Sequence, residues 1–307
     1  MEKTTLEKKL TLNEKHFKKF NLNNTFNTEL KENTFSDITF DEIYINSCSK
    51  LKTIHRNAFN TTDSVTKRFV MTFNPALSSP YNSIFETVSK FTLLEFIYIS
   101  GNNITEIPSN AFQNIVGEQD QLKEIRLAGE SFRELGNNTF SKLKNLKNLK
   151  IIGTSIEFIP ENAFEFNEDS EQQLRIYLLG NKYLNSSGFS EKSLTKFKRP
   201  TTLTLTYFYV CESTYFKYLD QKIFEPFLLS NPKNTIDLNY GSLDCSNCKN
   251  KWLQKAGTLL NQIKGLKCFN DKPLNDTVNF MGCGDSVVNC SGTVFNINFN
   301  INNININ

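Results

Sequence analysis

The sequence predicts an α/β solenoid, with a parallel β-sheet on its concave face and loops or short helices on its convex face. Two periodic signals in the 307-residue chain support this fold. A motif with apolar residues at its first, fourth and sixth positions recurs along most of the chain. A phenylalanine follows the ninth position of six consecutive motifs by 10 or 11 residues. Two signals that keep the same phase indicate repeats stacked on one another.

The clearest motifs begin at Leu94 and Leu146, and each is followed by the phrase Ile-Pro-x-x-Ala-Phe. Their register places about nine units between residues 17 and 242. Successive ninth positions lie 23 to 33 residues apart. These ninth positions are Thr25, Cys48, Asn74, Asn102, Glu130, Thr154, Asn181, Phe208 and Gly241.

Stacking explains the motif. The first, fourth and sixth residues of each short strand face inward, where the neighbouring units cover them. A buried asparagine at the ninth position can bond the backbone of adjacent turns, which we expect of Asn74, Asn102 and Asn181. Small residues replace asparagine in other units, but Glu130 and the weak last two units depart from the pattern. We expect the ladder of asparagine bonds to be broken at Glu130, Phe208 and Gly241.

The recurring phenylalanines are predicted to be structural. One ring per unit is expected to stack on the convex side, which gives an apolar spine. This spine, rather than a cofactor pocket, accounts for much of the high phenylalanine content. Its predicted members are Phe35, Phe59, Phe85, Phe112, Phe140 and Phe164.

A cysteine-rich segment follows the last unit. It runs Leu243-Asp244-Cys245-x-x-Cys248-x-x-x-Trp252-Leu253 and continues to Cys268 and Cys283. With the Ile-Pro-x-x-Ala-Phe phrases, it resembles the extracellular leucine-rich-repeat proteins of animals, of the typical repeat type, over residues 17 to 283. Toll, Slit and chaoptin ectodomains share this architecture. The phrasing is most similar to arthropod secreted members, such as the non-catalytic subunits of crustacean luciferases.

The resemblance implies that residues 243–290 form a cap that covers the open end of the solenoid. It implies disulfides joining Cys245 to Cys268 and Cys248 to Cys283, with Trp252 plugging the last repeat. The chain departs from the family in having two residues between the first two cysteines, and four cysteines allow three pairings. A zinc site is the alternative for Cys245 and Cys248, but it lacks a second close pair of ligands.

The remaining cysteines and the two ends carry weaker expectations. Cys48 is expected to be a buried free thiol, whereas Cys211 and Cys290 are candidates for a further disulfide. Residues 1–16 form a charged lead or a degenerate repeat, and we interpret the N-terminus as incomplete because no secretory signal precedes the first repeat. Residues 291–307 form an Asn-rich tail that we expect to be disordered, with an aggregating strand as the alternative.

Several features favour an extracellular location and a protein partner. The formal net charge of +3 gives no indication of nucleic-acid binding. No apolar stretch is long enough for a membrane helix. Clustered cysteines and seven N-glycosylation sequons are typical of secreted proteins. The sequons begin at Asn23, Asn60, Asn103, Asn137, Asn185, Asn275 and Asn289.

Catalytic chemistry is not predicted. The only histidines, His16 and His55, are expected to face solvent, and the acidic residues are scattered through loops. No phosphate-binding loop, metal-spaced histidine pair or nucleophile elbow is present. We therefore expect no enzyme activity, no cofactor and no metal.

The candidate binding surface is the concave side of the strands, where the third, fifth and seventh positions point. Aromatic and arginine side chains alternate there, a mixture that is enriched in protein interfaces. Tyr98, Arg126, Lys150 and Tyr177 share one position in successive units and are expected roughly 5 Å apart. The alternative is that tyrosines simply suit a strand surface. The predicted binding residues are Tyr44, Phe96, Tyr98, Arg126, Lys150, Arg175 and Tyr177.

The sequence thus predicts a non-enzymatic extracellular module that binds a protein through its concave face, in adhesion, reception or recognition. Two alternatives remain open: a non-catalytic stabilising subunit of a secreted enzyme complex, and a structural matrix glycoprotein. The fold alone does not select among them.

Overall fold

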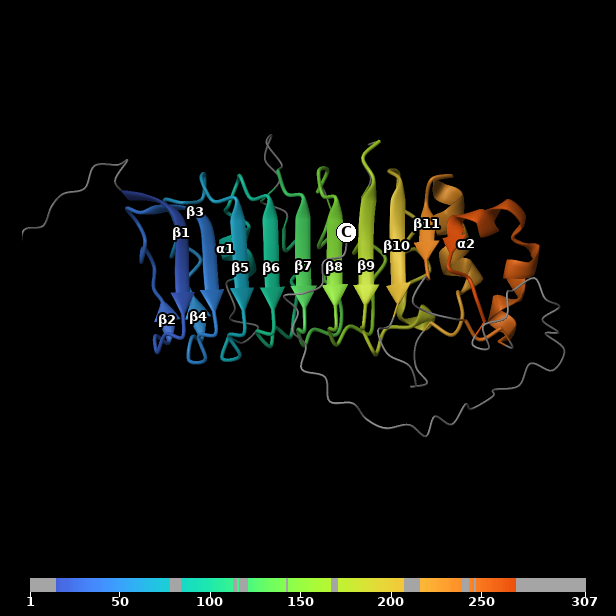
Figure 1. Ribbon diagram of the computed structural model, residues 1–307, viewed down its shortest axis with the longest axis horizontal. Coiled ribbons are helices and arrows are strands. Elements are labelled where there is room, and N and C mark those ends of the chain that lie inside the picture. Colours follow the sequence, from blue (N-terminus) through green and yellow to red (C-terminus); the bar gives the residue numbers. More distant parts are fainter. Residues whose placement is uncertain are drawn as a thin grey trace, which may run out of the picture.

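The computed structural model describes residues 15–77, 84–112, 115, 121–141, 143–166, 171–206, 216–238, 243–245 and 247–268. Its main feature is one parallel ten-stranded sheet with the order β1-β3-β5-β6-β7-β8-β9-β10-β11-β12 (Figure 1). The strands are β1 (His16–Asn23), β3 (Thr39–Asn46), β5 (Arg68–Thr72), β6 (Phe96–Ser100), β7 (Glu124–Ala128), β8 (Asn148–Ile152), β9 (Leu174–Leu179), β10 (Thr201–Thr206), β11 (Thr235–Asp237) and β12 (Ile263–Lys264).

Each of the nine predicted units contributes one strand, and the strands pair in the predicted register. Equivalent motif positions lie opposite one another: Ile97 pairs with Ile125, and Leu149 pairs with Ile176. The tenth strand, β12, was not predicted, because it has two residues and lies in the cysteine-rich segment without a repeat motif. A second, small sheet joins β2 (Glu29–Leu30) to β4 (Thr53–Ile54).

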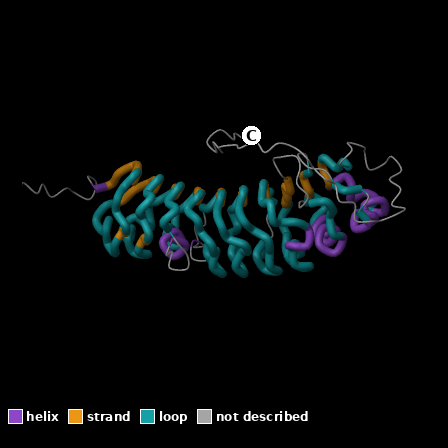
Figure 2. Tube along the Cα trace, turned by 90° about the horizontal axis from the view of Figure 1, so that it is seen from below, coloured by secondary structure: helices purple, strands orange, loops and turns teal. Residues whose placement is uncertain are grey.

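The strands lie along one side of the coil, and the turns and helices lie along the other (Figure 2). This arrangement fits a solenoid, because each unit returns through a turn or short helix to start the next parallel strand. The helical segments are α1 (Ile84–Val88), η3 (Ser186–Gly188), α2 (Gln221–Ser230), η4 (Cys248–Lys255) and η5 (Gly257–Gln262).

The inward side chains form one continuous hydrophobic core between these two sides. Phenylalanine rings run through it, and the rings of Phe112, Phe140 and Phe164 are stacked with centroids 5.7 and 6.0 Å apart. Phe197, which was not predicted, continues the row at 6.3 Å from Phe164. Phe91, which was not predicted either, packs against Phe59 with ring centroids 6.3 Å apart.

A polar ladder runs beside the apolar core at the ninth motif positions. The Oδ1 atom of Asn74 accepts from the backbone N–H of Cys48 at 2.9 Å, and the Oδ1 atom of Asn102 accepts from that of Asn74 at 3.1 Å. The Oδ1 atom of Asn181 accepts from that of Thr154 at 2.9 Å. The predicted role of these asparagines is therefore confirmed. Cys48 is a buried free thiol, as expected.

The expected break at Glu130 is wrong. Its buried carboxylate accepts the N–H groups of Asn102 and Ile104 at 3.0 and 2.8 Å, and it also accepts the Nδ2 group of Asn102 at 2.9 Å. The longer side chain of glutamate supplies the acceptor that asparagine supplies elsewhere. Phe208 and Gly241 lie outside the described residues.

One of the two disulfides that the resemblance implied lies at the end of the array. Cys245 and Cys268 form a disulfide. This pair excludes the alternative of a zinc site that uses Cys245. Trp252 is buried against the core, and its indole N–H donates to the carbonyl of Leu219 at 2.8 Å. Cys248 is also disulfide-bonded. The predicted partner Cys283, the other candidate pair Cys211 and Cys290, and the tail lie outside the described residues.

Candidate functional site

The candidate site is the sheet face, by which we mean the outward side chains of β3 to β9. Parallel pairing aligns these side chains in rows that cross the strands. The third-position row contains Glu42, Arg68, Phe96, Glu124, Asn148 and Arg175. The fifth-position row contains Tyr44, Val70, Tyr98, Arg126, Lys150 and Tyr177. The structure thus brings all seven sequence-predicted residues onto one surface.

Cations lie over aromatic rings across the sheet face. The guanidinium group of Arg68 lies 4.1 Å from the ring centre of Phe96, and that of Arg126 lies 5.6 Å from the same ring. The ammonium group of Lys150 lies 5.6 Å from the ring centre of Tyr177. Each contact between a cation and a ring contributes roughly 0.5–1 kcal/mol at an exposed site. These contacts hold the long side chains of the sheet face in place.

Glu124 organises the middle of the sheet face. Its carboxylate accepts a hydrogen bond from the Nε atom of Arg126 and lies 3.2 Å from the Nζ atom of Lys150. Charge-assisted bonds of this kind are stronger than neutral ones, particularly where the groups are shielded from water. Glu124 and Arg126 lie on β7 and Lys150 lies on the adjacent β8, so the three side chains hold one another in place across two strands.

Burial at the sheet face differs from the expectation of a freely exposed surface. Lys150 is only 9% exposed, because Glu124 and Tyr177 flank it. Tyr44, Phe96, Tyr98 and Tyr177 are half-buried, whereas Arg175 is exposed. The face is therefore a packed layer of half-buried aromatic side chains, with the side chain of Arg175 exposed to solvent.

Two tyrosines of the fifth-position row are held in their neutral form. Burial raises the pKa of Tyr177, and the carboxylates of Asp237 and Glu124 add to this effect while Arg175 opposes it. Burial also raises the pKa of Tyr44, with a further contribution from Glu42, which accepts its hydroxyl hydrogen bond at 3.1 Å. Both phenols therefore remain hydrogen-bond donors at neutral pH.

One contact at the edge of the sheet face was missed from the sequence. The ammonium group of Lys19 on β1 lies 3.7 Å from the ring centre of Tyr44. Lys19 occupies the third position of the first unit, because it pairs with Glu42. The repeat register contained this signal, but the first unit, which directly follows the charged lead, was not included in the predicted binding surface.

The predicted glycosylation sites lie mostly away from this surface. Asn103, Asn137 and Asn23 are exposed, and Asn60 and Asn185 are half-buried. Asn23 ends β1, where its Oδ1 atom accepts from the Nδ2 atom of Asn46 at 3.2 Å. The predicted site Asn275 lies outside the described residues. A glycan at Asn23 would shield only the first end of the sheet face.

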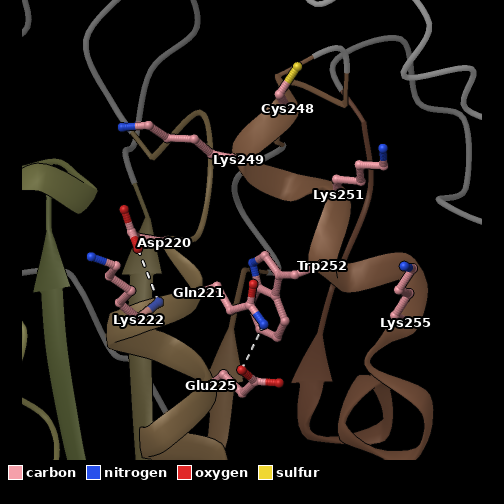
Figure 3. A pocket seen from close by; sticks show the side chains of 9 residues that line it. All are labelled: Asp220, Gln221, Lys222, Glu225, Cys248, Lys249, Lys251, Trp252 and Lys255. Carbon is pink, nitrogen blue, oxygen red and sulfur yellow. Dashed lines mark hydrogen bonds between the residues drawn. The ribbon is translucent and has the colours of Figure 1, made fainter.

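A hollow with a volume of about 460 Å³ lies between α2 and η4, where the last repeats meet the cysteine-rich segment (Figure 3). Lysines and acidic groups form much of its rim. Two of these lysines are engaged already: the Nζ atom of Lys222 lies 3.1 Å from Glu191, and that of Lys249 lies 3.1 Å from the Tyr218 hydroxyl. No predicted binding residue lines this hollow, so the sheet face remains the candidate site.

Neither a metal site nor a membrane-spanning helix is found in the described ranges. Among these residues, no group of histidine, cysteine, aspartate or glutamate side chains is placed to hold a metal ion. No helix in the part of the chain that the structure describes has the length and apolarity needed to span a membrane. Both histidines, His16 and His55, are exposed, as expected.

Fold and site together define the chain as a solenoid-like repeat protein with a long, pre-packed sheet face. Its sequence is 23% identical over 276 residues to the Oplophorus-luciferin 2-monooxygenase non-catalytic subunit of Oplophorus gracilirostris. The alignment covers 81% of this chain and 69% of that relative. No protein-family model matches the sequence.

Proposed function

We propose that this chain is an extracellular leucine-rich-repeat protein that binds another protein through its sheet face. The observation that carries the proposal is the continuous layer of rings and cations across β3 to β9. Aromatic and arginine side chains dominate the binding energy of protein interfaces. A layer already held in place loses little conformational entropy when a partner binds.

The leucine-rich-repeat assignment is supported by the shared register of the strands and by the asparagine ladder. The distant relative adds to this support. The repeat motifs of this chain independently resemble the secreted leucine-rich-repeat proteins that include non-catalytic subunits of crustacean luciferases. The disulfide between Cys245 and Cys268 supports an extracellular location, since such bonds persist in oxidising compartments.

Expression in a secretory host tests the location. Intact-mass analysis with and without deglycosylation and reduction should show at least one N-glycan and a disulfide that contains Cys245. Cys48 should react with alkylating agents only after unfolding, because it is buried. A secreted, unglycosylated protein in which all seven cysteines are alkylated without reduction would contradict an extracellular design.

Removal of two rings tests the binding face. We expect the Tyr98→Ala, Tyr177→Ala double variant to lose partner affinity by at least about tenfold, because truncation of central aromatic anchors costs about 2 kcal/mol or more. The measurement is quantitative capture from the extracellular fluid of the organism that makes the protein. Proteins retained by the immobilised wild type and by the double variant are compared.

The matched control is Tyr183→Ala. Tyr183 is 46% exposed and follows β9 rather than lying on it, so its loss should leave capture unchanged. Circular dichroism should be the same for all three proteins. Equal capture by wild type and double variant, with a partner bound by both, would remove the sheet face as the binding site.

A second candidate function is that of a non-catalytic subunit in an enzyme complex. The similarity to a subunit with that name favours it. It is distinguished by the identity of the captured protein: stoichiometric co-purification with a catalytic chain supports the subunit role. Capture of a non-enzymatic surface protein supports recognition or adhesion instead.

A further inference from the structure

Cations outnumber carboxylates on the central part of the sheet face. The third-position and fifth-position rows of β5 to β9 are described in full. They contain the cations Arg68, Arg126, Lys150 and Arg175 and a single carboxylate, that of Glu124. This excess is local, since the net charge of the whole chain is only +3. The imbalance favours a partner that brings negative charge.

Two of these four cations already have a carboxylate and two do not. Glu124 serves both Arg126 and Lys150. Arg68 and Arg175 form no ion pair with any residue that the structure describes. One face of the Arg68 guanidinium lies on the ring of Phe96, and the Nη2 atom of Arg175 donates to the Oε1 atom of Gln173 at 3.2 Å. Each keeps further N–H groups for an incoming carboxylate, which arginine binds in a two-pronged manner.

The spacing of these two arginines defines the shape of the anionic group. Both lie in the third-position row, four strands apart, and neighbouring strands are about 4.8 Å apart, which separates them by roughly 19 Å. An extended peptide advances about 3.3 Å per residue, so about six residues span that distance. Between the two arginines the segment would cross Phe96, Glu124 and Asn148.

The order of charges in this row argues against a uniform polyanion. From β5 to β9 the row reads Arg68, Phe96, Glu124, Asn148, Arg175, so a negative group stands midway between the two positive ones. A sulfated polysaccharide would place anionic groups over Glu124, and it would meet Glu42 beside Arg68 as well. A peptide with separated acidic residues and an uncharged middle avoids both contacts.

We propose that the sheet face between β5 and β9 binds an extended acidic protein segment, with Arg68 and Arg175 each receiving one carboxylate. The inference rests on the proposed function, because it names the chemistry of the partner at the same surface. Phe96 and Tyr98 form the apolar floor between the two carboxylate positions. Arg126 and Lys150 are held in place by Glu124 and supply the surrounding positive potential.

The test is fluorescence anisotropy with three labelled probes. The first is a Ser/Tyr peptide with two aspartates about six residues apart, and the second carries asparagines in their place. The third is a heparin hexasaccharide. We expect the aspartate peptide to bind wild type, and we expect the Arg68→Gln, Arg175→Gln double variant to weaken this binding by at least about tenfold.

The matched control is the Arg56→Gln, Arg133→Gln double variant. It removes the same charge from two exposed arginines that do not belong to the strands of the sheet face. Its affinity for the aspartate peptide should stay within about twofold of wild type. An equal loss in the control would overturn the inference, because the binding would then reflect net charge alone. No binding of the aspartate peptide below about 1 mM, or equal binding of the asparagine peptide, would overturn it as well.

The proposal is also refuted if the heparin hexasaccharide binds wild type more tightly than the aspartate peptide does and if the Arg68→Gln, Arg175→Gln variant loses that binding. The ligand of this surface would then be a polyanion and not an acidic protein segment. The capture assay separates this failure from failure of the proposed function. If the arginine variant keeps the natural partner while the Tyr98, Tyr177 variant loses it, the face binds a protein but not through acidic residues. If both variants lose the partner, both proposals are supported.

Discussion

Replacing Phe140 by alanine should lower the free energy of unfolding by about 3–5 kcal/mol, the usual cost of deleting a fully buried ring. The ring is 0% exposed and stacks between Phe112 and Phe164. A cavity there removes contacts from both neighbouring units, and small local relaxation cannot fill it because each unit is held by the next. Urea unfolding followed by tryptophan fluorescence and circular dichroism measures the loss.

The control for this variant is Phe26→Ala. Phe26 is 80% exposed, so its removal should change stability by no more than about 0.5 kcal/mol. The Phe112→Ala, Phe140→Ala double variant adds a further check, because stacked rings should show a coupling of about 0.5–1.5 kcal/mol. A loss below about 1 kcal/mol for Phe140→Ala would contradict a structural role for the spine.

The parallel sheet was predictable because the stacking of units requires apolar residues at fixed positions of every motif. A residue such as Ile97 must be apolar because Phe69 of the preceding unit and Ile125 of the next unit flank it, and this requirement repeats in every unit. The same logic aligned Tyr98, Arg126, Lys150 and Tyr177, which lie opposite one another in successive strands. Periodicity therefore carries both the fold and the rows of the candidate site.

Contacts between particular side chains could not be predicted in the same way. The motif places Lys150 on the outer side of β8, but its burial depends on Glu124 and Tyr177 closing around it. Likewise, the motif gives no reason for Phe91 to meet Phe59, because Phe91 belongs to the variable segment between strands. Segments of variable length are set by packing that a repeat pattern does not encode.

The turn before each ninth position shows a second regularity that would have strengthened the prediction. Gly101, Gly129, Gly153 and Gly180 occupy this position directly after four successive strands, all with positive φ. Glycine is the residue that adopts this conformation without strain. Phe73 occupies the same position in an earlier unit at φ 56°, where its side chain is exposed rather than packed in the core.

Glu130 was misassigned because sequence patterns treat an acidic residue at a buried position as a defect. The structure places its carboxylate where three N–H groups converge, from the backbone of Asn102 and Ile104 and from the Asn102 side chain. Those donors favour the ionised form, but burial outweighs them and raises the pKa of Glu130. Glu130 therefore accepts the hydrogen bonds of the ladder, but burial of its charge costs free energy that a neutral asparagine would not lose.

Substitutions at Glu130 should separate these two contributions. Glu130→Ala leaves the converging N–H groups without an acceptor, and we expect it to lower the free energy of unfolding by about 3 kcal/mol, since each buried unsatisfied group costs about 1–3 kcal/mol. Glu130→Asn restores the residue that Asn74, Asn102 and Asn181 provide in their units. It should keep the acceptor, remove the buried charge and be at least as stable as wild type at neutral pH.

The pH dependence gives the sign of the charge effect. A folded-state pKa above the ordinary value of 4.5 means that the folded protein retains the Glu130 proton after the unfolded chain has lost it. The contribution of Glu130 to stability must therefore fall as pH rises above about 4.5, and it levels off above the folded pKa. The stability of Glu130→Asn relative to wild type should increase over the same range in urea titrations from acidic to neutral pH. A constant difference, or one that shrinks with pH, would mean that the converging N–H groups outweigh burial and that the carboxylate is a favourable part of the ladder.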